Sequence, residues 1–129
     1  MKKVLVVMLS LVASFVLVTS ALATDRDVIK QQVDEIVVAL NGGKTPQDFK
    51  DAAKREPYYV FIMQQDGTLL VHPSLEGKNL KEKAGPVYEA LIASTPEGTW
   101  VDYEWQGKQK HSYVRTTDGG LIVGSGYSE

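Results

Sequence analysis

Aromatic and basic side chains from residue 59 onward are the ones best suited to bind a small molecule. Tyrosine joins an apolar ring to a hydroxyl, so it can line a cavity and still donate a hydrogen bond. A pocket for a small ligand needs such side chains, although the same rings would also serve simply as core. The set consists of Tyr59, His72, Trp100, Tyr103, Lys110, His111, Tyr113 and Tyr127.

Two basic residues of this set can each be interpreted in two ways. Lys110 lies on a predicted strand, where it is either a solvated charge at a sheet edge or, if it points into a cavity, the natural partner of a carboxylate. His72 ends a predicted strand before Pro73 and serves either a structural contact or a ligand. Regular pleating places Lys110 and Tyr113, three residues apart, on opposite faces of a sheet. Both therefore reach one pocket only across a β-bulge.

Patterns typical of catalytic, cofactor and metal sites do not occur in the sequence. No nucleophile elbow surrounds Ser74 or Ser125, and the glycines at 119–126 do not open a helix as a phosphate loop does. The carboxylates form no Glu/His pair at metal-site spacing, and His72 and His111 lack a convincing third ligand. Without cysteine, disulfides, thiol catalysis and thiolate zinc sites are excluded. We therefore predict no enzyme, no cofactor and no metal; an enzyme of unrecognised type is the alternative.

The first 23 residues have the pattern of an export signal. A basic start, Met1-Lys2-Lys3, precedes an apolar run to Val18 and the small residues of Ala21-Leu22-Ala23. The run is close to the length of a short membrane span, so a retained anchor is the alternative. Because no second apolar stretch of that length follows, a two-pass receptor or a transporter is excluded. We predict a cleaved signal peptide and a periplasmic or secreted protein.

Removal of residues 1–23 from the 129 leaves 106, which suffices for one domain, residues 24–129. Loss of Lys2 and Lys3 lowers the basic residues from 14 to 12 against 16 acidic ones, a net charge of −4. Nucleic acid and anionic lipid surfaces are poor partners for such a chain. We expect no stable membrane insertion after cleavage.

Two helices are predicted at the start of this domain. Thr24 can cap the first, Asn41-Gly42-Gly43 ends it, and its apolar residues recur as one buried stripe. The second begins at Thr45-Pro46 and ends before Pro57. The stripe of the first helix consists of Ile29, Val33, Ile36, Val37 and Leu40.

Five strands are predicted in the rest of the chain. A hairpin over 58–72 turns at Asp66-Gly67, residues 74–85 are mainly loop, and Pro86 opens a further helix. Residues 99–127 form three strands in meander order. Because hairpin-connected strands are antiparallel, we predict an α+β fold. A five-stranded antiparallel sheet carries the long N-terminal helix on one face, and residues 74–95 partly cover a concavity on the other.

Seven short motifs in a fixed order resemble single-Cache domains, extracytoplasmic ligand-sensing modules with a PAS-like fold. The resemblance covers roughly residues 26–129 and implies a pocket on one sheet face for small organic ligands, often short carboxylates. The motifs are Tyr59-Val60-Phe61, Asp66-Gly67-Thr68, His72-Pro73, Gly77-Lys78-Asn79-Leu80, Trp100-Val101-Asp102-Tyr103, Lys110 with Tyr113-Val114, and Val123-Gly124-Ser125-Gly126-Tyr127. On the matching positions the implied pocket consists of Tyr59, Phe61, His72, Trp100, Tyr103, Lys110, Tyr113 and Tyr127.

The resemblance implies reversible binding of a carboxylate-bearing, anionic small molecule by Lys110, His72 and the tyrosines. Sensor members of the family are followed by a membrane span and signalling domains, whereas nothing of this kind follows Tyr127. We therefore expect a stand-alone binding domain without its own signalling module, and a membrane receptor or signalling protein is the candidate partner. The alternative is an exported adaptor that modulates a membrane receptor through protein–protein contacts and has a vestigial pocket.

Overall fold

The computed structural model describes residues 25–129, and the predicted signal peptide lies outside them. No helix among these residues is both long and apolar enough to cross a membrane. In chain order the elements are α2 (Arg26–Asn41), the 3-10 helix η1 (Pro46–Lys54), β1 (Val60–Met63), β2 (Leu69–Val71), α3 (Leu80–Lys83), α4 (Gly85–Leu91), β3 (Thr99–Trp105), β4 (Lys108–Thr116) and β5 (Ile122–Ser128).

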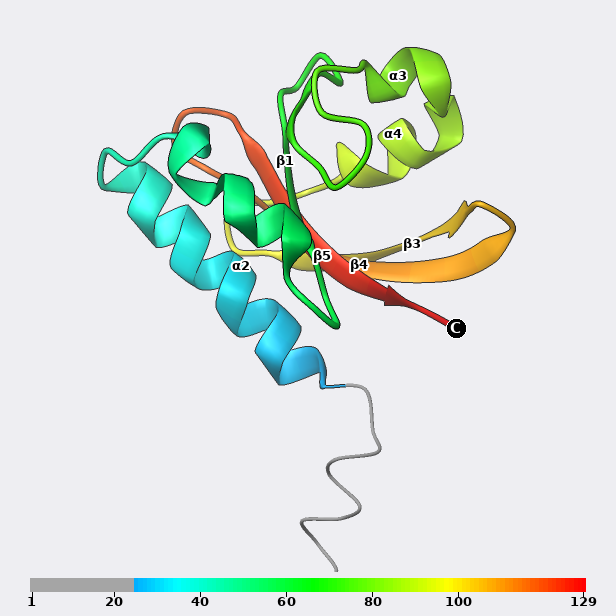
Figure 1. Cartoon of the computed structure of the whole chain (residues 1–129), viewed down its shortest axis with the longest axis horizontal. Coiled ribbons are helices and arrows are strands. Elements are labelled where there is room, and N and C mark those ends of the chain that lie inside the picture. The colour runs from blue at the N-terminus through cyan, green and yellow to red at the C-terminus, as the bar shows by residue number, and fades with distance from the viewer. Residues whose placement is uncertain (1–24) are drawn as a thin grey trace, which may run out of the picture.

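The strands form one antiparallel sheet in the order β2-β1-β5-β4-β3, so the predicted α+β fold is confirmed (Figure 1). The β3–β4 hairpin closes through Gln106 and Gly107, whose φ angles of 51° and 80° are those of a tight two-residue hairpin turn. β1 and β5 pair at the centre although they are distant in the sequence. β3 is an edge strand with β4 as its neighbour.

Helix α2 covers one face of the sheet together with η1. Asp25, rather than the predicted Thr24, is its N-cap and accepts bonds from the amides of Asp27 and Val28. The predicted apolar stripe packs on β4 and β5, and η1 adds Ala52 and Ala53 to the same core. Burial of this stripe therefore fixes α2 on the sheet.

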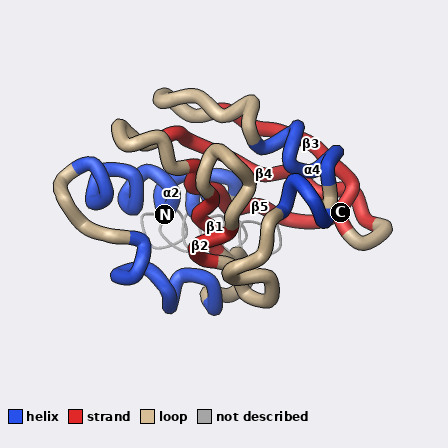
Figure 2. Tube along the Cα trace, turned by 90° about the horizontal axis from the view of Figure 1, so that it is seen from above, coloured by secondary structure: helices blue, strands red, loops and turns tan. Residues whose placement is uncertain are grey.

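Helices α3 and α4 cover the opposite face, and Figure 2 shows the strands between α2 and α4. The expectation of loop over residues 74–85 was wrong in part, because Leu80–Lys83 form a single helical turn capped by the Asn79 side chain. The Asn79 amide also donates to the Asp66 carbonyl, and the Tyr88 hydroxyl donates to the Gln65 carbonyl at 2.6 Å. These bonds tie both helices to the β1–β2 turn and hold them above the sheet.

Candidate ligand-binding site

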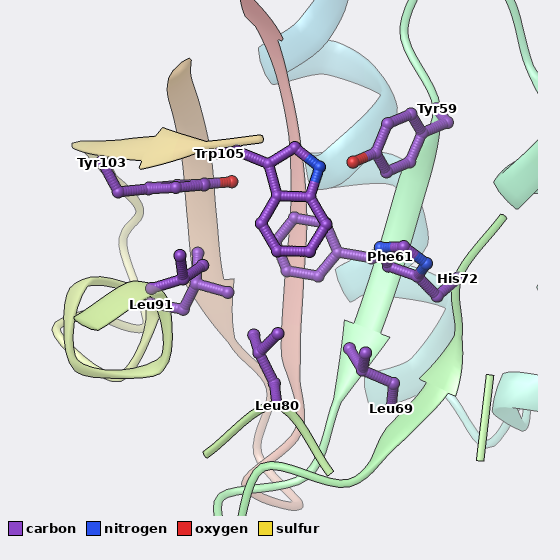
Figure 3. Close-up of a pocket in the computed structure, with 9 residues that line it drawn as sticks. Tyr59, Phe61, Leu69, His72, Leu80, Leu91, Tyr103 and Trp105 are labelled. Atoms are coloured by element: carbon purple, nitrogen blue, oxygen red, sulfur yellow. The ribbon is translucent and has the colours of Figure 1, made fainter. Parts of the chain in front are cut away.

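A small cavity lies between the sheet and the covering helices α3 and α4, where the sequence predicted a concavity. It leaves about 20 Å³ for the centre of a water-sized sphere, which is room for about one water molecule. Aromatic rings come from the strands, and aliphatic side chains come from β2 and the helices (Figure 3). The lining residues are Tyr59, Phe61, Leu69, His72, Leu80, Val87, Leu91, Tyr103 and Trp105.

The floor of the cavity depends on a glycine in β5. Gly124 is the cross-strand partner of Phe61, and a Cβ built on it would lie 2.3 Å from the Phe61 ring. Any side chain at this position would therefore displace the ring from the sheet surface. Gly124 leaves the space in which Phe61 lies flat enough to form the floor.

Lys110 is a buried cation beside the cavity. Its residue is 4% exposed, and its Nζ donates a 2.6 Å hydrogen bond to the hydroxyl of Tyr59, a lining residue. Among residues 25–129 no carboxylate forms an ion pair with it. Burial lowers the pKa of Lys110 to about 8. A buried ammonium that has no carboxylate partner among residues 25–129 is suited to pair with the carboxylate of a ligand.

His72 is a neutral hydrogen-bond donor at the cavity wall. Its Nδ1 accepts from the amides of Ser74 and Leu75 at 3.1 and 3.0 Å, which leaves Nε2 to carry the proton. Burial, with a smaller effect of the Lys110 charge, lowers its pKa to about 4. The ring lies edge-on to Tyr59 at 5.6 Å and to Trp105 at 6.2 Å between centroids.

Tyr103 adds a second hydroxyl on this face. It is the cross-strand partner of Lys110, and its hydroxyl lies 2.8 Å from that of the buried Ser112. Burial raises the pKa of Tyr103, so its hydroxyl stays protonated and can donate. Among the lining residues, Tyr59, His72 and Tyr103 supply polar groups, and Lys110 reaches the cavity through its bond to Tyr59.

The remaining predicted residues, Trp100, Tyr113 and Tyr127, lie on the α2 face of the sheet and do not line this cavity. β4 pairs with β5 without a bulge from Lys110↔Ser128 to Thr116↔Ile122, so Lys110 and Tyr113 point to opposite sides. The eight predicted residues therefore do not share one pocket. Five of them, Tyr59, Phe61, His72, Tyr103 and Lys110, lie on the cavity side.

The three rings on the α2 face hold the helix. The Arg26 guanidinium lies 4.3 Å from the Trp100 ring centroid and donates to the Tyr127 hydroxyl at 2.7 Å. The Tyr113 hydroxyl donates to Asp34 of α2 at 3.2 Å. These contacts give Trp100, Tyr113 and Tyr127 a structural role at the helix–sheet boundary.

Several lining residues were missed by the sequence analysis. The most important of them is Trp105. Its position two residues after Tyr103 places both side chains on one face of β3, and this spacing could have identified it. Leu80 and Leu91 were not recognisable as pocket residues, because their placement depends on how α3 and α4 pack on the sheet.

His111 lies on the α2 face, opposite the side of Lys110, and its ring packs against that of Tyr127 at a tilt, with centroids 5.1 Å apart. Its Nδ1 lies 2.5 Å from Asp102, and its Nε2 lies 3.4 Å from Glu129. It therefore cannot share a ligand or an ion with His72 across the sheet. Within residues 25–129 no three histidine, aspartate or glutamate side chains gather closely enough to hold a metal ion.

The chain is similar in fold to solved sensor structures. No family model and no curated protein matches it. A methyl-accepting chemotaxis protein from Vibrio parahaemolyticus superposes with a TM-score of 0.56 at 19% identity, over 80% of this chain and 87% of that one. The ligand-binding domain of the Pseudomonas fluorescens chemoreceptor CtaA with L-leucine superposes with a TM-score of 0.42 at 23% identity, over 67% of this chain and 38% of that one. The extracellular domain of the putative histidine kinase mmHK1S-Z2 superposes with a TM-score of 0.47 at 17% identity, over 64% of this chain and 36% of that one. The chain thus has an α+β, PAS-like fold similar to that of the Vibrio chemotaxis protein.

Proposed function

We propose that this domain senses a small organic anion, a carboxylate-bearing metabolite, in the cavity beneath α3 and α4. The ligand's carboxylate accepts from Lys110, Tyr59 and His72, and its apolar part packs on the floor formed by Phe61. The observation that carries this proposal is the buried Lys110 ammonium, which has no carboxylate partner among residues 25–129.

The electrostatics favour an anion over a neutral ligand. An unpaired buried charge disfavours the folded state, and a carboxylate at Lys110 would offset that cost. Hydrogen bonds that involve a charged group are about twice as strong as neutral ones. Support also comes from the Tyr59 hydroxyl, already 2.6 Å from Lys110, and from the proton that His72 carries on Nε2.

Export, stand-alone action and the absence of enzymatic activity belong to this proposal as predictions. The fold of the Vibrio chemotaxis protein supports a sensory rather than a catalytic domain. Fractionation of the host cells, with N-terminal sequencing of the mature protein, tests export. We expect a periplasmic or secreted chain that begins at Thr24; retention of residue 1 in a membrane fraction would contradict it.

A thermal-shift screen of carboxylates of graded size against their amides tests the ligand class. A ligand that binds only the native state raises the melting temperature with concentration. We expect hits among the acids and not among the amides, and we expect Lys110→Ala to abolish them. Lys108→Ala is the matched control, because Lys108 lies on the same strand and face but is exposed. A hit that is indifferent to Lys110→Ala would refute the site.

The small size of the cavity favours one second candidate, an adaptor whose pocket is vestigial and whose outer surface contacts a membrane receptor. Pull-down from host membranes, with and without a carboxylate hit, separates the two functions. A sensor gives capture that changes with the ligand. An adaptor gives capture that is independent of every compound in the screen.

A further inference from the structure

Trp105 is one of the residues that line the cavity, and its indole projects between lining side chains from other elements. Figure 3 shows the indole projecting between Tyr59 on one side and Tyr103 and Leu91 on the other. The centroid of its ring lies 6.2 Å from that of His72, in a T-shaped arrangement. With the indole in this place the cavity has room for about one water molecule, so even a small carboxylate does not fit.

Little in the described domain holds the indole there. Trp105 is half-buried, and its indole nitrogen makes no hydrogen bond to any residue from 25 to 129. It is the last residue of the edge strand β3, next to the Gln106–Gly107 turn at the tip of a hairpin that projects from the body of the domain (Figure 1). Rotation of the side chain out of the cavity therefore breaks apolar contacts and no polar bond.

We propose that Trp105 is a displaceable plug: its indole fills the space that the apolar part of the ligand takes, and it swings outward when the ligand enters. This inference rests on the proposed function, which supplies the ligand's carboxylate. It adds the size of the apolar part of the same ligand. A group that replaces the indole meets Phe61, Leu80, Leu91 and the edge of His72. The ligand class is therefore a carboxylic acid with a ring-sized apolar substituent, such as phenylacetate, rather than acetate.

Chemical rescue of Trp105→Ala tests the plug without any knowledge of the natural ligand. Apolar cavities left by the removal of a large side chain bind small apolar molecules of matching shape. Free indole should raise the melting temperature of Trp105→Ala and not that of the wild type. Trp100→Ala is the matched control, because it removes the same side chain from beneath Arg26 on the other face. Equal responses of Trp105→Ala and Trp100→Ala to indole would overturn the proposal.

Phenylacetate supplies the second measurement. If the plug is out in about one molecule in ten, Trp105→Ala binds phenylacetate about tenfold more tightly than the wild type. Tenfold weaker binding would make Trp105 a wall of the site and overturn the plug. Indole rescue without phenylacetate binding to either protein would uphold the plug and refute the carboxylate function.

Fluorescence reports the motion directly and does not depend on an alanine variant that folds. In Trp100→Phe, Trp105 is the single tryptophan of the chain. Quenching by iodide should increase when phenylacetate is added, because the indole moves into solvent. Quenching that decreases in the presence of bound phenylacetate would show that the indole closes over the ligand, and would overturn the proposal.

Discussion

Replacing Lys110 with methionine should stabilise the ligand-free domain and abolish carboxylate binding. Methionine has a similar length and no charge, so it can occupy the same buried site without the cost of a dry ammonium. The residue is 4% exposed, and burial alone lowers its pKa from the ordinary value of 10.5 to about 8. The buried ammonium of Lys110 therefore makes the folded state of the wild-type domain less stable.

The magnitude follows from this pKa. A fall from 10.5 to about 8 disfavours the buried ammonium by about 3 kcal/mol. Loss of the bond to the Tyr59 hydroxyl costs about 1 kcal/mol. The net gain of Lys110→Met at neutral pH is therefore about 2 kcal/mol, and the expected rise in melting temperature is about 8 °C for a domain of this size.

The pH dependence has a definite sign. Below about pH 8 Lys110 is protonated in both the folded and the unfolded chain, so the full cost is present. Between pH 8 and 10.5 the unfolded chain binds more protons, and the stability of the wild type rises with pH. The advantage of Lys110→Met should therefore shrink across this window.

Urea denaturation at several pH values, with calorimetric titration of a carboxylate hit, measures both effects. Lys108→Met is the control and should change neither stability nor binding, because Lys108 is exposed. A Lys110→Met domain that is less stable than the wild type at pH 7 would refute the reasoning. Retained carboxylate affinity would refute the role of the charge.

Three further outcomes follow from the same contacts. Carboxylate affinity should fall about tenfold between pH 7 and pH 9 as Lys110, with a pKa of about 8, loses its proton; a flat calorimetric profile would contradict this. Gly124→Ala should lower the free energy of unfolding by about 1–3 kcal/mol, because its Cβ would lie 2.3 Å from the Phe61 ring; urea curves that match those of the wild type would contradict it. Asp102→Asn should lower the pKa of His111, which the hydrogen bond to Asp102 raises most; NMR titration of the imidazole with an unchanged midpoint would count against that pairing.

The sequence was sufficient for the elements that follow strong periodic or turn signals. Ile29 and Val33 recur at helical spacing, and the Asp66-Gly67 dipeptide has few conformations other than a tight turn. The helix Leu80–Lys83 was not predicted, because a single turn is too short to give a periodic pattern and because it depends on its Asn79 cap. Local patterns therefore predicted the layers of the fold but not the short helix that covers the cavity.

The candidate site was harder to predict, because a strand residue lines it only when its side chain lies on the cavity face of the sheet. Alternation alone correctly separated Lys110 from Tyr113. Placing Trp100 and Tyr127 on the α2 face required the pairing of β3, β4 and β5, which the sequence does not state. Trp105 follows Tyr103 by two residues and therefore shares its face of β3. It was missed because the cavity on that face depends on how α3 and α4 pack on the sheet.

A crystal structure of the protein purified from its native host, examined for density at the cavity, tests the central claim most directly. The account predicts a carboxylate within hydrogen-bond distance of Lys110 Nζ and the Tyr59 hydroxyl, with the Trp105 indole outside the cavity. A ligand bound elsewhere, such as against Trp100 and Arg26 on the α2 face, with the indole still in place, would contradict it.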